Sequence, residues 1–163
     1  MLAKDAFVAA FSLADLTVGM YLDGLDDNAL LVRPVPGCNH IAWQIGHLIV
    51  ADHNLTEGMF PGSMPALPAG FAEKFTKETS KLDSAGAFLP KATLLEEKAR
   101  QRAAILALLA KLTPEDFDKP GPEMFREMCP TVGSVFDLIA QHWIMHAGQW
   151  AVIRRKLGFA PLF

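Results

Sequence analysis

Apolar residues recur at intervals of three and four positions in four stretches of the chain, and no convincing alternation of apolar and polar residues competes with them. Such intervals place side chains on one face of an α-helix, whereas strict alternation indicates a half-buried strand. The pattern predicts long helices over about residues 3–22, 39–58, 93–112 and 131–157. Four such helices around a shared core imply an all-α four-helix bundle.

Two of these helices carry clear apolar stripes that we expect to face the core. In the first helix the stripe consists of Phe7, Phe11, Ala14, Val18 and Leu22. In the third helix it consists of Leu95, Ala99, Ala103, Leu106 and Ala110. The first helix also carries Asp5 and Asp15, which argue against a secretory signal despite its apolar character.

Capping and breaking residues mark the ends of the helices. Asn39 follows the breaker RPVPGC and is a plausible N-cap of the second helix. Thr93 and Glu96 form a capping box that predicts the start of the third helix. Thr131 is expected to open the last helix, and Gly158 to follow it as the C′ residue.

Two connecting segments separate the later helices. Residues 60–90 combine the turn-rich PGSMPALPAG with a polar stretch, and such long connectors are often functional lids or mobile segments. A second connector holds one short helical turn, with Thr113 as its cap and Pro114 at its first position.

Composition restricts the classes of function. The 163 residues are 51% apolar and 20% charged, which predicts one globular domain spanning residues 1–163. A net charge of −3 gives no electrostatic signature of nucleic-acid binding, and no apolar run is long enough to predict a membrane span. The two cysteines, Cys38 and Cys129, belong to no CxxC pair, so we expect unreactive thiols in a protein of the reducing cytoplasm.

The sequence HWIMH places His142 and His146 four positions apart within an apolar helix. At that spacing the two Cβ atoms are about 5–6 Å apart, so both imidazoles can bind one metal ion. The HExxH protease motif is excluded because Trp143 occupies the glutamate position. The sequence has no paired Glu-x-x-His motifs for a di-iron centre and no CxxCH for covalent haem, although an axial His and Met pair stays open.

A third ligand would have to come from the second helix, which holds the other three histidines. His47 is the candidate, because it lies mid-helix beside Gly46 and at a height that matches His142 if the two helices run parallel. His40 at the helix start is expected to be solvated, and His53 points away from His47. The alternative is that the buried histidines are hydrogen bonded to carbonyls or carboxylates, and spacing does not choose between the two.

Other residues near these histidines could support a site. Trp43 and Trp150 are each four positions from a candidate ligand and could line the site, although aromatic residues at this spacing are more often core. Gln149 could hydrogen bond a ligand or pack between helices. Asp52 and Asp137 are interpreted as solvated or capping carboxylates, so the catalytic base is unknown.

The segments NHIAWQIGHLIVADHNL and HWIMHAGQWAVIRRKLG resemble the second and last helices of the DinB/YfiT-like superfamily. The connectors GLDDNALLVRPVPG and LTPEDFDKP are also similar to those of the family. The resemblance implies an up-and-down four-helix bundle with a divalent metal ion, typically nickel or zinc. It also implies that the ligands are His47, His142 and His146.

Three imidazoles leave a coordination position open, as in catalytic zinc sites. Relatives in the family include bacillithiol transferases. The resemblance therefore implies thiol-dependent transfer or related hydrolysis on a small molecule, with a low-molecular-weight thiol as the expected partner. The alternative is a bundle that binds metal or a small ligand without turnover, in a stress response. Family members often pair, so a homodimer is expected by resemblance, although the sequence alone shows no decisive apolar seam.

Overall fold

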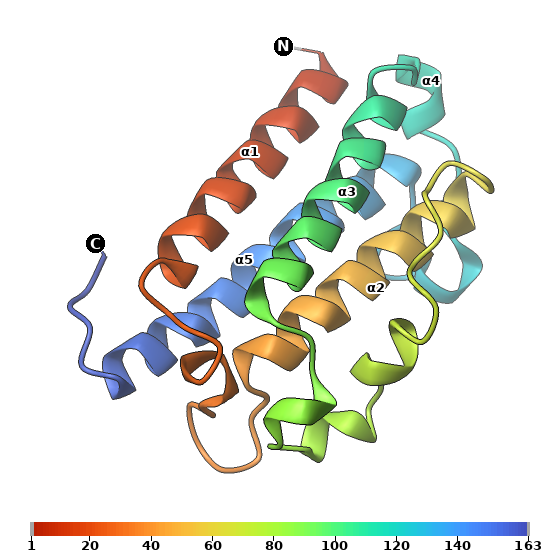
Figure 1. Ribbon diagram of the computed structural model, residues 1–163. Coiled ribbons are helices and arrows are strands. Elements are labelled where there is room, and N and C mark those ends of the chain that lie inside the picture. The colour runs from red at the N-terminus through yellow and green to blue at the C-terminus, as the bar shows by residue number, and fades with distance from the viewer. Residues whose placement is uncertain (1, 163) are drawn as a thin grey trace.

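The computed structural model describes residues 2–162, and four long helices form most of it (Figure 1). Residues 2–162 contain no β-strand. The helices are α1 (Ala3–Leu22), α2 (Ile41–Met59), α3 (Lys91–Leu109), the short α4 (Pro114–Phe117) and α5 (Val132–Lys156). The expected all-α four-helix bundle with a long connector between its second and third helices is thereby confirmed.

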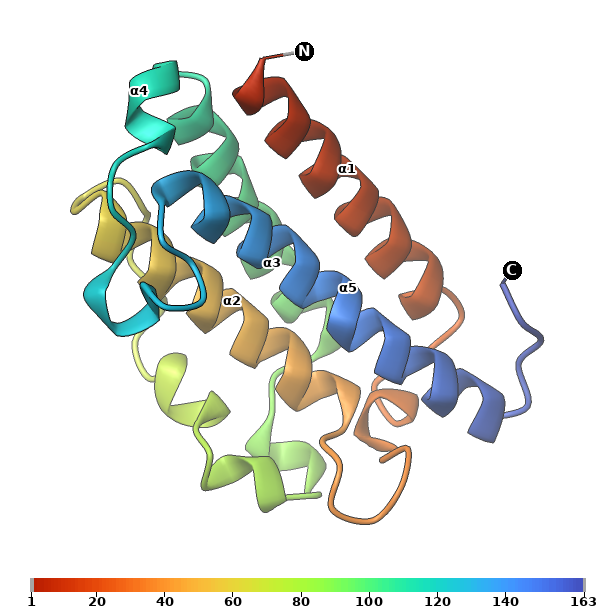
Figure 2. The same ribbon diagram turned by 180° about the vertical axis from the view of Figure 1, so that it is seen from behind.

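The directions of the helices differ from the alternating order implied by the resemblance. Gln44 near the start of α2 bonds Trp150 near the end of α5, whereas Asp52 later in α2 bonds the earlier Trp143. These contacts make α2 and α5 antiparallel, which corrects the expectation that they run parallel. α2 and α3 run in the same direction instead (Figures 1 and 2).

The long connector explains this order. A helix of 19 residues such as α2 is about 28 Å long, and the extended chain of residues 60–90 is long enough to run back along it. The connector contains only short 3-10 turns, at Ala72–Phe75, Thr79–Lys81 and Ala85–Ala87. It returns the chain to the end of the bundle where α2 began, so α3 repeats the direction of α2 (Figure 2).

Most helix ends agree with the sequence analysis, and two are corrected. The N-cap of α2 is His40 rather than Asn39, because the Nδ1 atom of His40 accepts the backbone N–H of Trp43. α3 begins at Lys91, two residues before the predicted capping box, since its backbone N–H donates to Asp27.

The ends of α4 and α5 were predicted correctly. Thr113 and Asp116 form the capping box of α4, with Pro114 at its first position. Thr131 caps α5, and Gly158 follows the helix with a φ of 87°. That left-handed conformation is one that glycine adopts without the steric cost other residues incur.

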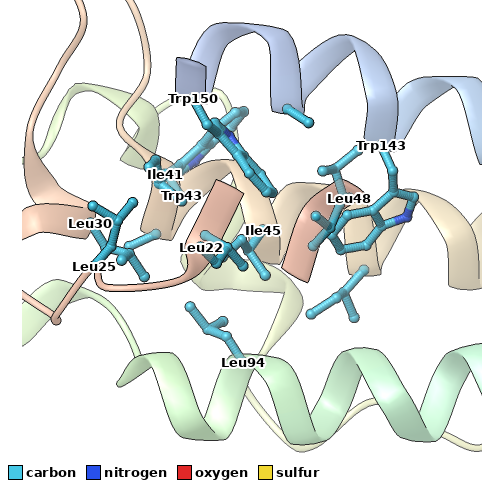
Figure 3. Packing of buried hydrophobic residues seen from close by; sticks show 14 of the residues in the cluster. Leu22, Leu25, Leu30, Ile41, Trp43, Ile45, Leu48, Leu94, Trp143 and Trp150 are labelled. Atoms are coloured by element: carbon cyan, nitrogen blue, oxygen red, sulfur yellow. The ribbon is translucent and has the colours of Figure 1, made fainter. Parts of the chain in front are cut away.

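The core fills the space between the four helices. The stripe predicted for α1 is buried from Phe11 to Leu22, with Phe7 partly buried beside it. Figure 3 shows how Trp143 and Trp150 of α5 and the leucines and isoleucines of α2 pack towards Leu94 of α3. Apolar burial of this kind is the main driving force for the bundle.

The inward stripe predicted for α3 is confirmed only for Leu95 and Leu106, which are partly buried against the core. Ala99, Ala103 and Ala110 are exposed, while Leu94, Ile105 and Leu109 are buried. The buried face also holds four polar or charged side chains, Glu97, Lys98, Gln101 and Arg102, all of which are wholly or partly buried. Lys98, Gln101 and Arg102 have partners on other elements, whereas Glu97 pairs with Arg100 and Gln101 of α3 itself. The local apolar pattern therefore pointed to the wrong face.

Candidate metal centre

α2 and α5 bring together the three histidines singled out by the sequence. One ligand nitrogen from each of His47, His142 and His146 lies within 4.8 Å of those of the other two. The ring centroids are 5.3 Å apart for His47 and His142, and 5.7 Å apart for His47 and His146. All three side chains are half-buried, so the cluster can be reached from solvent.

The spacing of the nitrogens fits a divalent metal ion. The Nε2 atoms of His142 and His146 are 3.2 Å apart. Two nitrogens bound to one tetrahedral zinc ion at 2.0–2.1 Å are about 3.3–3.4 Å from each other. The His142 and His146 nitrogens therefore match the spacing of two ligands of a tetrahedral ion, and a nitrogen of His47 lies within 4.8 Å of both.

Burial favours the neutral form of these imidazoles. Desolvation, followed by repulsion from neighbouring histidines, lowers the pKa of His142 and of His146 to about 4. Burial also lowers the pKa of His47. At neutral pH the rings present lone pairs rather than positive charges, which is the form that binds metal.

The amide of Gln44 holds His146 in a defined orientation. Its Oε1 atom accepts a hydrogen bond of 2.8 Å from Nδ1–H of His146 and another of 2.8 Å from Nε1–H of Trp150. Because an amide oxygen only accepts, the Nδ1 atom of His146 carries the proton and its Nε2 lone pair faces His142. This arrangement is typical of histidines that bind metal.

Two further hydrogen bonds hold Gln44 itself. Its Nε2 atom donates to the carbonyl oxygen of Asn39 at 2.6 Å and to Oε1 of Gln149 at 3.1 Å. Gln149 therefore supports Gln44 and not a histidine directly. Trp150 is fully buried and also connects to the cluster through Gln44.

Sequence reasoning missed Gln44, although a signal was present. Gln44 is the one polar residue between His40 and His47 in an otherwise apolar run, and it is completely buried. A buried amide requires hydrogen-bond partners, so an amide three positions before a candidate ligand indicates a supporting role.

Trp43 forms one wall of the cluster. Its ring stacks on that of His47, with centroids 4.9 Å apart and planes 7° from parallel. Its Nε1–H donates to the carbonyl oxygen of Thr76 in the connector at 3.0 Å. The connector thereby fixes the tryptophan that limits the movement of His47.

The connector packs on α2 at two further points beside the cluster. Phe75 lies directly on Gly46, where no side chain stands between the ring and the helix backbone. His40 donates from Nε2–H to the carbonyl oxygen of Leu82 at 3.1 Å. His40 is fully buried, so the expectation that it would be solvated is wrong.

The remaining candidate residues lie outside the histidine cluster. Asp52 is buried and accepts a hydrogen bond of 2.8 Å from Nε1–H of Trp143, which corrects its interpretation as a solvated carboxylate. Asp137 is exposed as expected, and His53 bonds Gln101 of α3. Burial raises the pKa of the Cys129 thiol, which agrees with an unreactive cysteine.

Comparison with known proteins agrees with this geometry. The sequence model of the DinB superfamily matches residues 16–150, which include all three histidines. The solved structure of YfiT from Bacillus subtilis, described as a probable metal-dependent hydrolase with an unusual four-helix bundle topology, is similar with a TM-score of 0.60 and 18% identity. The similarity covers 96% of this chain and 89% of that chain, and at this identity it shows the fold alone. Comparison with curated proteins found no match.

Proposed function

Because the chain belongs to the DinB superfamily, we propose that it is a divalent-metal-dependent enzyme whose ion is held by His47, His142 and His146. The convergence of these three imidazoles from two helices is the observation that carries the proposal. Neutral nitrogen ligands suit zinc or nickel, and both are consistent with the donor set.

A metal ion held by three imidazoles would make bound water or a thiol acidic enough to act as a nucleophile near neutral pH. Several features of the protein keep the three imidazoles neutral and in position to bind the ion. Burial keeps the rings neutral, Gln44 directs one of them, and Trp43 holds another from the side. Half-burial of the rings leaves a path for a small substrate.

We propose that the reaction is nucleophilic attack on a small electrophilic molecule, by a low-molecular-weight thiol or by water. The resemblance to bacillithiol transferases supports the thiol, and the description of YfiT as a probable metal-dependent hydrolase supports water. Both reactions use the same open coordination position, so they differ only in the nucleophile that enters it.

The second candidate function is metal or ligand binding without turnover. It is favoured by the position of Asp52, the buried carboxylate nearest in sequence to His47, which is bonded to Trp143 and faces Arg102. Because the Asp52 carboxylate is held in the core by Trp143 and Arg102, it does not serve as a base at the histidine cluster. If the protein is an enzyme, Asp52 is not its base, and the metal ion alone would generate the nucleophile.

The first experiment measures metal content by elemental analysis of the purified protein. We expect about one zinc or nickel ion per chain, loss of that ion in His142→Ala, and retention in His53→Ala, whose histidine bonds Gln101 outside the cluster. Stoichiometric metal in His142→Ala would contradict the ligand assignment.

The second experiment separates the enzyme from the binding protein. The metal-loaded protein is assayed with cysteine, glutathione, bacillithiol and mycothiol against model electrophiles, and with ester and amide substrates in water. We expect turnover that is lost in His142→Ala and kept in His53→Ala. Bound metal without turnover on any substrate would favour the binding function.

A further inference from the structure

A cavity of about 340 Å³ lies between the long connector and the first half of α3. Its polar and charged lining residues are Lys74 of the connector and Thr93, Glu96, Glu97 and Arg100 of α3. The cavity is separate from the candidate metal centre, because none of the three histidines lines it. Its volume lies at the lower end of the range for small-molecule sites, so it suits a ligand of metabolite size.

The two walls of the cavity are held in place by internal contacts. The four α3 residues follow one another at intervals of three, one and three positions, which puts them on one face of the helix. The side chains of Arg100 and Gln101 donate to the carbonyl oxygens of Ala66 and Pro65 in the connector, at 2.7 and 2.9 Å. These hydrogen bonds fix the connector against α3 beside the cavity.

One part of the lining is apolar. Phe71 is 2% exposed, and its ring packs on that of Phe75 with centroids 4.9 Å apart. Phe75 in turn lies on the backbone of α2 at Gly46. Pro68 and Leu89 extend this apolar part of the lining. A firmly packed apolar surface favours a ligand with a hydrocarbon or aromatic body.

The charged lining residues divide into one bonded pair and two available groups. The Nε and Nη2 atoms of Arg100 donate to the carboxylate of Glu97 at 2.9 and 2.6 Å, so these two charges compensate each other. Lys74 and Glu96, by contrast, take part in no ion pair among residues 2–162. They lie on opposite walls, one on the connector and one on α3. The cavity therefore offers one positive and one negative charge beside an apolar surface.

We propose that this cavity binds an apolar α-amino acid as its zwitterion, with the ligand's carboxylate at Lys74 and its ammonium group at Glu96. Near neutral pH such a molecule carries one charge of each sign next to an apolar side chain, which matches the lining. Hydrogen bonds between charged partners are stronger than those between neutral ones. The hydroxyl group of Thr93, one helical turn before Glu96, provides a further hydrogen-bonding group at the α3 wall.

Ligands of other charge fit this lining less well. An organic anion would bring its negative charge towards Glu96, and an organic cation would bring its positive charge towards Lys74. A neutral apolar molecule would displace water from both groups without replacing the lost hydrogen bonds. A zwitterion supplies a partner for each of the two charges.

Calorimetric titration of the full chain with phenylalanine and with leucine, at about pH 6, tests the site. Ligands of this size predict a dissociation constant of about 0.1–1 mM. Glycine lacks the apolar body and should bind at least tenfold more weakly. N-acetylphenylalanine lacks the ammonium group and phenylalaninamide lacks the carboxylate, so each should bind at least fivefold more weakly than phenylalanine.

Two variants test which charge binds which end of the ligand. Lys74→Gln should weaken the binding of phenylalanine and N-acetylphenylalanine at least fivefold, but not that of phenylalaninamide. Glu96→Gln should weaken the binding of phenylalanine and phenylalaninamide, but not that of N-acetylphenylalanine. Lys77→Gln and Glu73→Gln are the matched controls, because they remove the same charges from exposed connector residues that do not line the cavity. Both controls should stay within twofold of the wild type.

Amino acids also chelate divalent metal ions, so a third variant separates the cavity from the candidate metal centre. His142→Ala, which is expected to lose the ion, should bind phenylalanine within twofold of the wild type. Binding at the cavity does not rest on the proposed function, since it is expected with or without metal at the histidines.

Several results would overturn the inference. They are the absence of binding at phenylalanine and leucine concentrations up to about 10 mM, and binding that Lys74→Gln and Glu96→Gln leave unchanged. Equal affinities for phenylalanine and its amide or N-acetyl derivative would contradict recognition of a zwitterion. Loss of phenylalanine binding in His142→Ala would assign the amino acid to the histidine cluster instead.

Discussion

A single amide links a candidate metal ligand to the core of the bundle. The Oε1 atom of Gln44 accepts from both His146 and Trp150, while its Nε2 atom donates to Asn39 and Gln149. Every hydrogen-bonding direction of the amide is in use, so it cannot flip without losing bonds. Gln44 thus fixes which nitrogen of His146 faces the metal position.

We predict that Gln44→Leu weakens zinc binding by about 10–100-fold, the usual cost of losing a partner of a metal-bound histidine. Calorimetric titration of metal-free protein with zinc measures the effect. Gln149→Ala is the control, because Gln149 touches the cluster only through Gln44, and it should change affinity less than threefold. Equal affinities for Gln44→Leu and the wild type would refute the role of this amide.

At the scale of single residues, the sequence identified the histidines but not the residue that orients them, Gln44. His142 and His146 share one helix, so helical geometry alone predicts that they are neighbours. Gln44 and His146 lie on different helices, and their contact depends on where α2 and α5 cross. Spacing along one segment carries no information about that crossing.

At the scale of elements, the connector between α2 and α3 is part of the candidate site. It covers the start of α2 through Phe75 on Gly46, and it accepts hydrogen bonds from Trp43 and His40. A loop of this length usually forms lids or mobile segments, but this one is bound to the helix that carries His47. Its packing should therefore affect both stability and metal affinity.

Gly46→Ala tests that packing. The added Cβ would overlap the ring of Phe75, so we expect a loss of about 1–3 kcal/mol in the free energy of unfolding, as for other overpacked sites. Zinc affinity should fall as well, because displacement of Phe75 disturbs the connector beside His47. Urea unfolding followed by circular dichroism, with zinc titration, measures the two effects.

Gly148→Ala is the matched control, since a Cβ there meets nothing within 4 Å and the residue lies mid-helix in α5. Alanine has the higher helix propensity, so this variant should gain up to about 1 kcal/mol in stability. If Gly46→Ala behaved in the same way as Gly148→Ala, the close contact with Phe75 would have no energetic weight.

The buried face of α3 could not be identified from its apolar periodicity. The alanines of its predicted stripe face solvent, and Lys98 and Arg102 turn inward. A charged residue is normally assigned to the surface, because burying it alone is costly. Arg102 is buried because Asp15 and Asp52 lie 3.4 and 3.5 Å from its guanidinium, on α1 and α2.

At the scale of the whole molecule, a cluster of four charged side chains and one tryptophan, buried or partly buried, touches all four long helices. It comprises Asp15 of α1, Asp52 of α2, Lys98 and Arg102 of α3, and Trp143 of α5. Burial raises the pKa of Asp52 from its ordinary value to about 6, even though Arg102 and Trp143 favour its charged form. Desolvation therefore outweighs the ion pair at this carboxyl group.

The raised pKa of Asp52 predicts how stability depends on pH. Between about pH 4 and pH 6 the unfolded chain loses this proton while the folded protein keeps it, so the folded state binds more protons. The contribution of Asp52 to stability is thus highest at low pH and falls by about 2–3 kcal/mol as pH rises through this range.

Asp52→Asn removes this dependence. We expect the free energy of unfolding of the wild type, minus that of Asp52→Asn, to decrease by about 2–3 kcal/mol from pH 4 to pH 7 in urea unfolding experiments. The exposed Asp137→Asn should follow the wild-type curve. A difference that stays constant or increases with pH would show that Asp52 is charged throughout.

The sequence by itself determined the four helices, most of their ends, the stripe of α1 and the histidine pair of α5. Each of these is a property of one continuous segment, because helical periodicity and capping are local. The position of His47 within its helix made it the candidate third ligand, and the resemblance added the family and the assignment of His47 as a ligand; the match to the DinB superfamily confirms the family.

Only the tertiary structure decided the directions of the helices, the inward charges of α3 and the role of Gln44. Lys98 and Arg102 turn inward because their carboxylate partners Asp15 and Asp52 lie on α1 and α2. Gln44 meets His146 because of where α2 and α5 cross. Features made by two helices are set by how those helices pack, and periodicity within either one cannot specify them.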